Sequence, residues 1–492
     1  MIQFGEWMPD QADFQNPGAL EANGVIPKAI GYGPFKNLGN VTLATTARAQ
    51  GAVSFKDLSG GTHNFCGDAT KLYKLNATDG ITWDDVSRSS GGAYAAPVSG
   101  WWDFSQHANV VLATNGVDVV QAYTLGSSSV FAAVAGSPPV ATFTGLVREF
   151  SVLARISSNF TRVVWSGYGD PTAWTASATT QSDLQTLADG GTIMGLVGGE
   201  YGIVFQERAI QRMTYDGPPL FFRFDKLTSL LGCRAERSIA AHGSLVFFLS
   251  DAGPCMIVDG GQPTQIGSNK VNGWLEENID SSYLYRITAC VDPVKEVYMM
   301  GFADTGATSG TPNHIFGYHW PTQRCFHAQV GHEMLYTAMT QVGYTLDSLA
   351  TVNSNIDLIT LSLDDRSWTG VGRISAAGFD TSHKMGFFSG ANIAATLDTA
   401  EHQLFPGQRN LVTGLRPMVQ GTNVTPTVAA ITRNKENEAI TVGADIPVNS
   451  FGIVPMRSNA RYHRARLKIP AGSVWSTALG VDEIKAVPAG GR

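Results

Sequence analysis

The densest group of potential metal ligands in the chain lies between residues 314 and 332. It comprises His314, His319, Cys325, His327 and His332. Side chains alternate along a β-strand, so His319, Cys325 and His327 would share one face, and a hairpin bend would have to gather them around a zinc ion. No short C-x-x-C or H-x-x-x-H pair anchors such a site. We therefore expect no metal site and interpret these residues as structural.

Two adjacent pairs of carboxylates are the next candidates for chemistry. Asp84 and Asp85 follow the stretch DGITW (79–83), and Asp364 and Asp365 occur in a similar setting. DGITW is similar to the aspartate box of sialidase propellers, but it lacks the residue that separates Asp from Gly. Aspartate is common in turns, and a general acid–base pair needs partners in space that adjacency does not supply. We interpret both pairs as turn residues.

The sequence contains no motif typical of hydrolytic enzymes. G-x-x-x-x-G-K-[ST], H-E-x-x-H and G-x-S-x-G are all missing. We therefore expect that the protein is not an enzyme and uses no cofactor. Five tryptophans keep one alternative open, a propeller that binds or cleaves host glycans during adsorption, because an exposed indole stacks on a sugar ring. They are Trp101, Trp102, Trp165, Trp174 and Trp320.

Short β-strands must carry these side chains, as the composition indicates. Charged residues make up only 15% of the 492 residues, and 54 residues are glycine. The chain exceeds the size at which one hydrophobic core stops growing, so more than one domain is expected. With a net charge of −7 and no broad cationic face, the chain is not expected to bind duplex DNA tightly.

Cysteine usage and hydropathy indicate where the protein assembles. The five cysteines are widely spaced and odd in number, which predicts free thiols and assembly in a reducing cytoplasm. The opening residues MIQFGEWMPD do not resemble a secretory signal, and no run of 18 apolar residues occurs. We expect neither secretion by that route nor membrane insertion.

One structural unit recurs along the chain: a β-type run, a turn rich in Asp, Gly or Pro, and a second β-type run. The seven copies begin at residues 71, 117, 160, 208, 254, 314 and 356. Two further strand-like runs precede most copies, such as GAVSFKD and HNFCGD before the first. Four strands in about 40–50 residues make one propeller blade. We predict an all-β fold in which residues 45–370 form a β-propeller of about seven four-stranded blades, with a pair of β-sandwiches as the alternative.

The pattern changes after Trp368, and residues 371–492 are predicted to form a small β-rich, sandwich-like domain. Within it, RYHRARLKI (461–469) alternates Arg464, Arg466 and Lys468 with apolar residues. This alternation predicts a strand with one basic and one apolar face. The basic face is either solvated or contacts an acidic neighbouring ring or, weakly, DNA.

Residues 1–44 are predicted to be an extended arm. The stretch WMPDQADFQNPGALEANGVIPKAIGYGPF (7–35) contains too many prolines and glycines to begin a core, and Asn16-Pro17-Gly18 fits a turn. Its large apolar side chains must be buried, either across the chain's own propeller or on a neighbouring subunit. The candidate assembly residues are Trp7, Met8, Phe14, Pro17, Tyr32 and Phe35.

The same stretch resembles the N-terminal signature of tail hub and nozzle proteins of short-tailed bacteriophages, including packaged-DNA stabilisation proteins. The resemblance lies in NPG (16–18), NGVIP (23–27) and GYGPF (31–35). WWDFSQHANVVLATNGVDVVQAY (101–123) is similar to blade segments of virion propellers. From about residue 371 onward no diagnostic match is visible.

The resemblance implies a structural virion protein in the phage tail, assembled in the host cytoplasm. It implies a homo-oligomer, a hexameric ring below the portal and adaptor, that forms part of the channel through which the genome leaves. The implied partners are the portal, the adaptor and other tail proteins, with transient, non-specific contact to genomic DNA. Whether the ring is a portal-proximal hub or a distal nozzle stays open.

Overall fold

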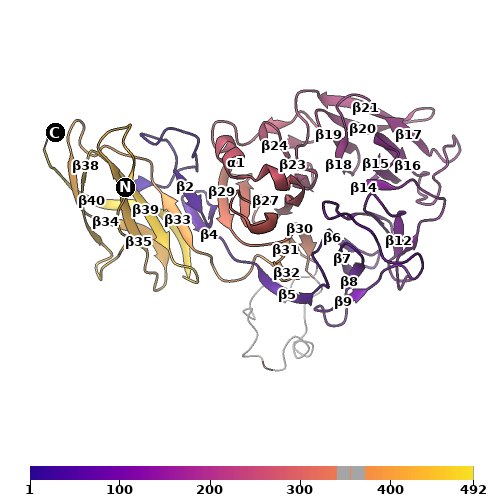
Figure 1. The fold of residues 1–492 in the computed structure, drawn as a ribbon, viewed down its shortest axis with the longest axis horizontal. Helices are drawn as coiled ribbons and strands as arrows, with labels where there is room; N and C mark the ends of the chain where they lie inside the picture. The colour runs from indigo at the N-terminus through magenta and orange to yellow at the C-terminus, as the bar shows by residue number, and fades with distance from the viewer. Residues whose placement is uncertain (341–354, 356–371, 491–492) are drawn as a thin grey trace.

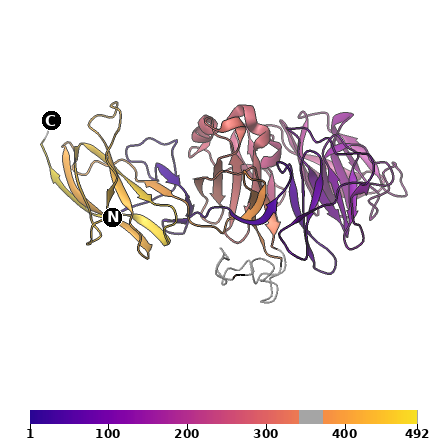
Figure 2. The ribbon, with the colours of Figure 1, turned by 60° about the horizontal axis from the view of Figure 1, so that its bottom comes forward.

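The computed structural model describes residues 1–340, 355 and 372–490. Within them the chain forms a β-propeller and a β-sandwich that lie side by side (Figure 1). A second view shows the same two bodies, with the N-terminal segment running between them (Figure 2). The fold is therefore all-β, with an N-terminal arm and a C-terminal β domain, as predicted.

The first five blades are four-stranded antiparallel sheets in which the spatial order of the strands follows the chain. The predicted hairpins become the third and fourth strands of each blade, so the observed arrangement excludes the pair of sandwiches. The strands are β6 (Ala52–Lys56), β7 (Thr62–Gly67), β8 (Leu72–Leu75) and β9 (Trp83–Asp85); β10 (Asp103–His107), β11 (Val110–Thr114), β12 (Gln121–Thr124) and β13 (Ala132–Ala133); β14 (Ala141–Val147), β15 (Phe150–Ile156), β16 (Asn159–Trp165) and β17 (Asp183–Thr186); β18 (Ile193–Val197), β19 (Gly202–Gln206), β20 (Ile210–Gly217) and β21 (Phe221–Thr228); and β22 (Ala240–His242), β23 (Leu245–Ser250), β24 (Gly253–Val258) and β25 (Thr264–Gln265).

One outer strand begins later than the hairpin repeat predicts. In the third blade the residues after the turn, AWTA (173–176), are not a strand, and β17 begins only at Asp183. Trp174 is buried against the second and third blades, so its apolar character reflects packing of a loop.

The sixth blade contains β26 (Thr288–Asp292), β27 (Val297–Phe302), β28 (His314–His319) and β29 (Arg324–Gln329). The seventh blade is assembled from both ends of the propeller sequence and contains β30 (Met334–Met339), β31 (Ile374–Phe379), β32 (Lys384–Phe387) and β5 (Gly39–Ala44). Residues 303–313 connect β27 to β28. The predicted hairpin from residue 356, with Asp364 and Asp365, lies outside the described residues.

Strand β5 closes the ring by pairing with β32, Ala44 opposite Lys384 and Gly39 opposite Phe387. The inner strands β30 and β6 of the last and first blades are in contact. The predicted propeller boundaries at 45 and 370 are therefore wrong at both ends. A closed ring removes exposed sheet edges, and it needs a strand from the opposite end of the chain, which local sequence patterns do not reveal.

Two facing sheets make up the sandwich, and the N-terminal arm contributes strands to both. One sheet contains β1 (Ile2–Gln3), β3 (Val25–Pro27), β4 (Tyr32–Pro34), β34 (Asn410–Gly421), β38 (Val454–Ala460) and β40 (Trp475–Pro488). The other contains β2 (Glu21–Asn23), β33 (Ala395–Asp398), β35 (Thr427–Arg433), β36 (Thr441–Val442), β37 (Ile446–Pro447) and β39 (Tyr462–Ile469). The predicted sandwich-like domain is thus present, but residues 1–34 complete it.

Strand β2 joins the two bodies. It pairs with β33 on one side and, in parallel, with β29 of the sixth blade at Asn23 and His327 on the other. Helical structure is confined to the short helix α1 (Asn272–Asn278) and the 3-10 helices η1 (Glu236–Ser238), η2 (Ser281–Arg286) and η3 (Thr308–Gly310) within the described residues. The sandwich and the propeller therefore share a continuous ten-stranded sheet.

Blade strands are apolar on both faces because neighbouring blades cover both. Every residue of β19 and of β27 is buried, as expected for strands enclosed on two sides. All five cysteines are buried and free, as predicted. Burial raises the pKa of the Cys233 thiol to about 12, so these cysteines act as small apolar side chains.

Candidate functional site

The arm folds back on itself at the predicted turn. The Asn16 side-chain oxygen accepts a hydrogen bond from the Gly18 amide at 2.8 Å, and Trp7 forms a parallel bridge with Ala19. A Cβ atom on Gly18 would lie only 2.0 Å from the Glu6 carbonyl oxygen. Only glycine therefore permits this close approach of the two halves of the arm.

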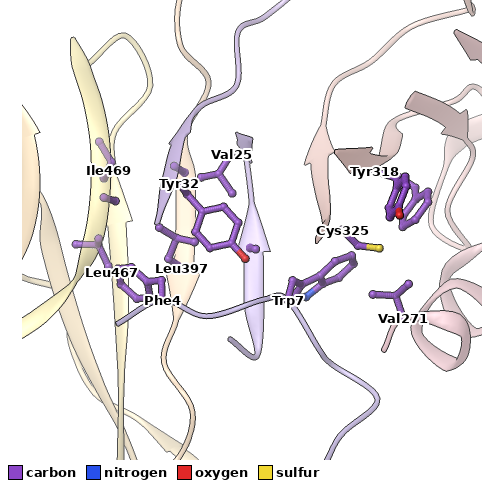
Figure 3. Close-up of a cluster of buried hydrophobic side chains, with 14 of the residues drawn as sticks. Phe4, Trp7, Val25, Tyr32, Val271, Tyr318, Cys325, Leu397, Leu467 and Ile469 are labelled. Carbon is purple, nitrogen blue, oxygen red and sulfur yellow. The ribbon is translucent and has the colours of Figure 1, made fainter. Parts of the chain in front are cut away.

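Trp7 is packed between the arm and the propeller. Its indole is fully buried and lies 4.8 Å from the ring of Trp274 and 4.6 Å from that of His327, measured between ring centroids. Figure 3 shows Trp7 on the propeller side, near Cys325 and Val271. One side chain of the arm thus fills the space between α1 and the sixth blade.

Tyr32 plays the corresponding part on the sandwich side (Figure 3). It is fully buried, its hydroxyl donates to the Gly5 carbonyl at 2.8 Å, and the Arg324 guanidinium lies 4.4 Å from the ring centroid. Burial raises the pKa of Tyr32 to about 12. Arg324 also donates to the Lys28 carbonyl, so a residue of β29 holds the arm from the propeller.

These contacts change the interpretation of the candidate assembly residues. Trp7, Tyr32 and Phe35 are buried within their own chain, and Phe14 is half-buried with its ring 5.2 Å from that of Tyr462. Met8 is half-buried, and only Pro17 is exposed. The buried side chains are unavailable to a neighbouring subunit, so the intramolecular alternative describes them.

The basic strand is also neutralised within the chain. Arg466 makes a two-pronged contact with Asp398 at 2.8 and 2.7 Å, Lys468 pairs with Asp445 at 2.8 Å, and Arg464 lies 3.6 Å from Asp13. Strand β33 brings Asp398 opposite Arg466, whereas Asp13 and Asp445 lie outside strands, so none of the three carboxylates comes from β39 itself. Alternation along one strand therefore predicted the basic face correctly but not its partners.

The histidines predicted as structural have separate partners. His314 lies 3.2 Å from Asp304, His319 lies 2.7 Å from Thr322, His327 is hydrogen-bonded to Glu21, and His332 lies 2.8 Å from the Val330 carbonyl. Within residues 1–340, 355 and 372–490, no cluster of three or more His, Cys, Asp or Glu side chains could hold a metal ion. Glu21 was not predicted, because its partner is more than 300 residues away in the sequence.

Asp84 and Asp85 were predicted to be turn residues but lie on strand β9, where they have different partners. Asp84 accepts from the Asn76 side chain at 3.0 Å, whereas Asp85 pairs with Lys71 at 2.9 Å. Asp79 of DGITW caps the preceding turn by accepting from the amides of Ile81 and Thr82. Each of these carboxylates therefore has a structural role in a hairpin.

Most of the tryptophans proposed for sugar stacking are not accessible. Trp101, Trp102, Trp165 and Trp174 are all buried, and Trp320 is half-buried with its ring 5.9 Å from that of Phe247. A glycan site built on these indoles has no support. The residues of a different aromatic pocket, in the third and fourth blades, were not identified from the sequence.

Two cavities of 440 and 160 Å³ lie among the inner strands of the propeller, and Trp101 and Arg237 border both. Trp101, before β10, donates to the Tyr285 carbonyl, before β26, at 2.7 Å. Arg237 of η1 pairs with Asp103 of β10 at 2.5 Å. Side chains from different blades thus meet across the ring and obstruct its centre.

Comparisons with known proteins give no family. No protein-family model matches the chain, and no curated protein matches it. Among solved structures it is similar to YCF48 bound to a D1 peptide, with 8% identity over 61% of this chain and 87% of that one and a TM-score of 0.37. It is also similar to the computationally designed Ika8 protein, with 9% identity over 78% and 99% of the two chains and a TM-score of 0.39.

These scores are too low to carry a functional argument, so the propeller is defined by its own strand order. None of the helices in the described part of the chain has the length and apolar character of a membrane span.

Proposed function

We propose that this chain is a structural protein of the tail of a short-tailed bacteriophage, a ring-forming hub or nozzle below the portal and adaptor. The observation that carries the proposal is the arm sequence at 7–35, whose resemblance to tail hub and nozzle proteins covers the residues that join the two bodies. Asn16, Gly18 and Tyr32 of that sequence each make a defined structural contact.

A rigid joint suits a ring component that must keep its shape while the genome passes. The propeller and the sandwich share one sheet through β2 and one apolar cluster that includes Phe4, Trp7 and Tyr32. Buried apolar contacts and backbone pairing resist hinge motion better than a flexible linker does. The proposed ring would therefore hold its subunits at constant internal geometry during genome exit.

The closed propeller constrains the proposed DNA path. Trp101 and Arg237 obstruct the ring of blades, so DNA would pass through a lumen shared between subunits. The basic residues of β39 are paired with carboxylates, and the chain carries a net charge of −7. Contact with the sliding genome would accordingly be weak and independent of base sequence.

Electron microscopy tests the proposal directly. Two-dimensional class averages of the purified chain, and symmetry-resolved maps of virions that contain it, should show a six-fold ring between the adaptor and the tip of the tail. Its presence in the virion with a different symmetry would retain the tail assignment and reject the hexamer. A protein that stays monomeric and is missing from virions would overturn the proposal.

A further inference from the structure

Another pocket opens on the face of the propeller opposite the larger cavity at Trp101. It has a volume of 390 Å³ and is lined by Arg148, Glu149, Tyr168, Gln181, Glu200 and Tyr215. Strand β14 runs from one face to the other. Thr142, near its start, borders the larger inner cavity, and Arg148 directly follows its end. The volume is within the range of small-molecule sites, about 300–1,000 Å³.

The backbone around this pocket is preorganised. The turn at Arg148 and Glu149 is tied to the turn at Glu200, since the Arg148 amide donates to the Gly199 carbonyl at 2.8 Å and the Gly199 amide donates to the Leu146 carbonyl at 2.9 Å. The Glu149 carbonyl accepts from the Gly169 amide at 2.8 Å. Hydrogen bonds between blades three and four therefore fix the loops that carry the lining side chains.

The rings of Tyr168 and Tyr215 pack against a buried phenylalanine. Phe150 is fully buried, and its ring centroid lies 5.4 Å from that of Tyr168 and 5.5 Å from that of Tyr215. Tyr168 nevertheless remains 57% exposed. A large aromatic surface is thus held rigidly and presented to solvent, at a site where packing alone would favour covering it.

Polar groups with unused hydrogen-bonding capacity surround this ring. Within the described residues the Glu149 carboxylate and the Tyr168 hydroxyl have no hydrogen-bond or ion-pair partner. The Gln181 side-chain oxygen accepts from the Tyr215 hydroxyl at 2.7 Å, which leaves its amide nitrogen as a donor. Arg148 pairs with Glu200 at 2.8 Å, and its guanidinium lies over the Tyr215 ring, 5.3 Å from the ring centroid. The ring of Tyr168 is therefore the one that a ligand can stack on.

We propose that this pocket binds a neutral or amino-bearing pyranose unit of a glycan. The C–H face of a pyranose is apolar and packs on an aromatic ring, and its hydroxyls both donate and accept. Glu149 and Gln181 supply an acceptor and a donor beside Tyr168. The carboxylates of Glu149 and Glu200 and the guanidinium of Arg148 give the pocket a net charge of −1, which disfavours phosphates and acidic sugars.

The test uses the full chain and methyl pyranosides of the gluco, galacto and manno series, with methyl glucosaminide and methyl glucuronide for charge. Saturation-transfer NMR and calorimetry should detect binding of at least one neutral or amino sugar. The glucuronide should bind at least about tenfold more weakly, because its carboxylate meets Glu149. Binding of no neutral or amino pyranoside at millimolar concentrations overturns the proposal, as does a preference for the glucuronide.

Variants separate this pocket from the rest of the surface. Tyr168→Ala should weaken sugar binding at least about tenfold, equivalent to about 1.4 kcal/mol, and Glu149→Gln should weaken it less. Phe451→Ala removes an aromatic that is 77% exposed on the sandwich, and it should leave binding unchanged. Unaltered binding by Tyr168→Ala, or an equal loss in Phe451→Ala, places the sugar elsewhere and overturns the assignment. This outcome is independent of whether the protein forms a tail ring.

Discussion

At the scale of single residues, the joint between the two bodies depends on side chains that look ordinary in the sequence. Trp7 contacts α1 and β29, and Tyr32 lies under Arg324. Each partner is far away along the chain. Substitutions at these positions should therefore report on the joint rather than on local secondary structure.

Trp7→Ala should lower the free energy of unfolding by about 3–5 kcal/mol, because it leaves a cavity in a fully buried site. Urea unfolding monitored by circular dichroism measures this change. Pro17→Ala, at an exposed position of the same arm, is the matched control and should be close to neutral. Equal stability of Trp7→Ala and the parent would show that the arm does not contribute to the core.

Arg466→Ala should destabilise the sandwich by about 3 kcal/mol at neutral pH, because it leaves the buried Asp398 carboxylate without its partner. Burial already raises the pKa of Asp398, and Arg466 is the main group that opposes the increase. In the variant the carboxyl should take up a proton as the pH falls, so the penalty should be smaller at pH 5 than at pH 8.

Lys468→Ala provides the control on the same strand. Lys468 and Asp445 are both about two-fifths exposed, and such pairs contribute about 0–1 kcal/mol. Chemical denaturation at the two pH values compares the variants. A penalty for Arg466→Ala that does not depend on pH would contradict the assigned role of Asp398.

His332 should make the stability of the protein depend on acid. Complete burial lowers the pKa of His332 from 6.5 to about 4. The unfolded chain therefore binds a proton that the folded chain does not, and stability should fall as the pH falls from 6.5 towards 4, by up to about 3 kcal/mol. In His332→Gln this part of the pH dependence, measured by thermal unfolding, should disappear; an unchanged profile would assign it to other groups.

At the scale of elements, β5 determines whether the propeller closes. The Thr42 hydroxyl on this strand accepts from the Trp83 indole at 3.1 Å and from the Met385 amide at 3.0 Å. It thereby ties the outer strand of the seventh blade to β9 of the first blade as well as to β32. This single side chain connects the two ends of the ring.

Thr42→Val should lower the free energy of unfolding by about 1–3 kcal/mol, because it keeps the shape of the side chain but leaves two buried donors unsatisfied. Leu43→Thr, at the neighbouring residue with 56% exposure, should change stability by less than about 0.5 kcal/mol. Equilibrium unfolding followed by tryptophan fluorescence distinguishes them. Closure of the ring would not depend on Thr42 if both variants behaved alike.

At the scale of the whole molecule, the arm supplies strands to the sandwich and β5 supplies a strand to the propeller, although the two are contiguous in sequence. Deleting residues 1–35 removes β1 to β4 from the sandwich and retains β5, whereas deleting residues 1–46 removes β5 as well. The shorter deletion should expose the sandwich to protease while β5 keeps the ring of blades closed. The longer one should make both susceptible.

Limited proteolysis with mass spectrometry measures these differences. A protected sandwich in the 1–35 deletion would show that the arm strands are dispensable. An intact propeller in the 1–46 deletion would show the same for β5. Loss of ring assembly in the shorter deletion would not by itself identify the arm as an intersubunit contact, because the same deletion removes part of a core.

The amino-acid sequence by itself determined the features that depend on neighbouring residues. Hairpins recurring every 42–60 residues predicted the all-β class and about seven blades, because each blade forms largely from one short segment. The turn at Asn16-Pro17-Gly18 and the basic face of residues 461–469 were predicted for the same reason. These properties follow from turn chemistry and strand alternation.

Only the tertiary structure decided which distant segments meet. Ala44 pairs with Lys384, Glu21 with Asp398, and Asn23 with His327, so the arm completes the sandwich and β5 completes the propeller. The pocket at Tyr168 likewise combines three loops and strand β20 from two blades. Strand pairing depends on backbone hydrogen bonds that every residue except proline can make, so local sequence does not specify which distant strand will be the partner.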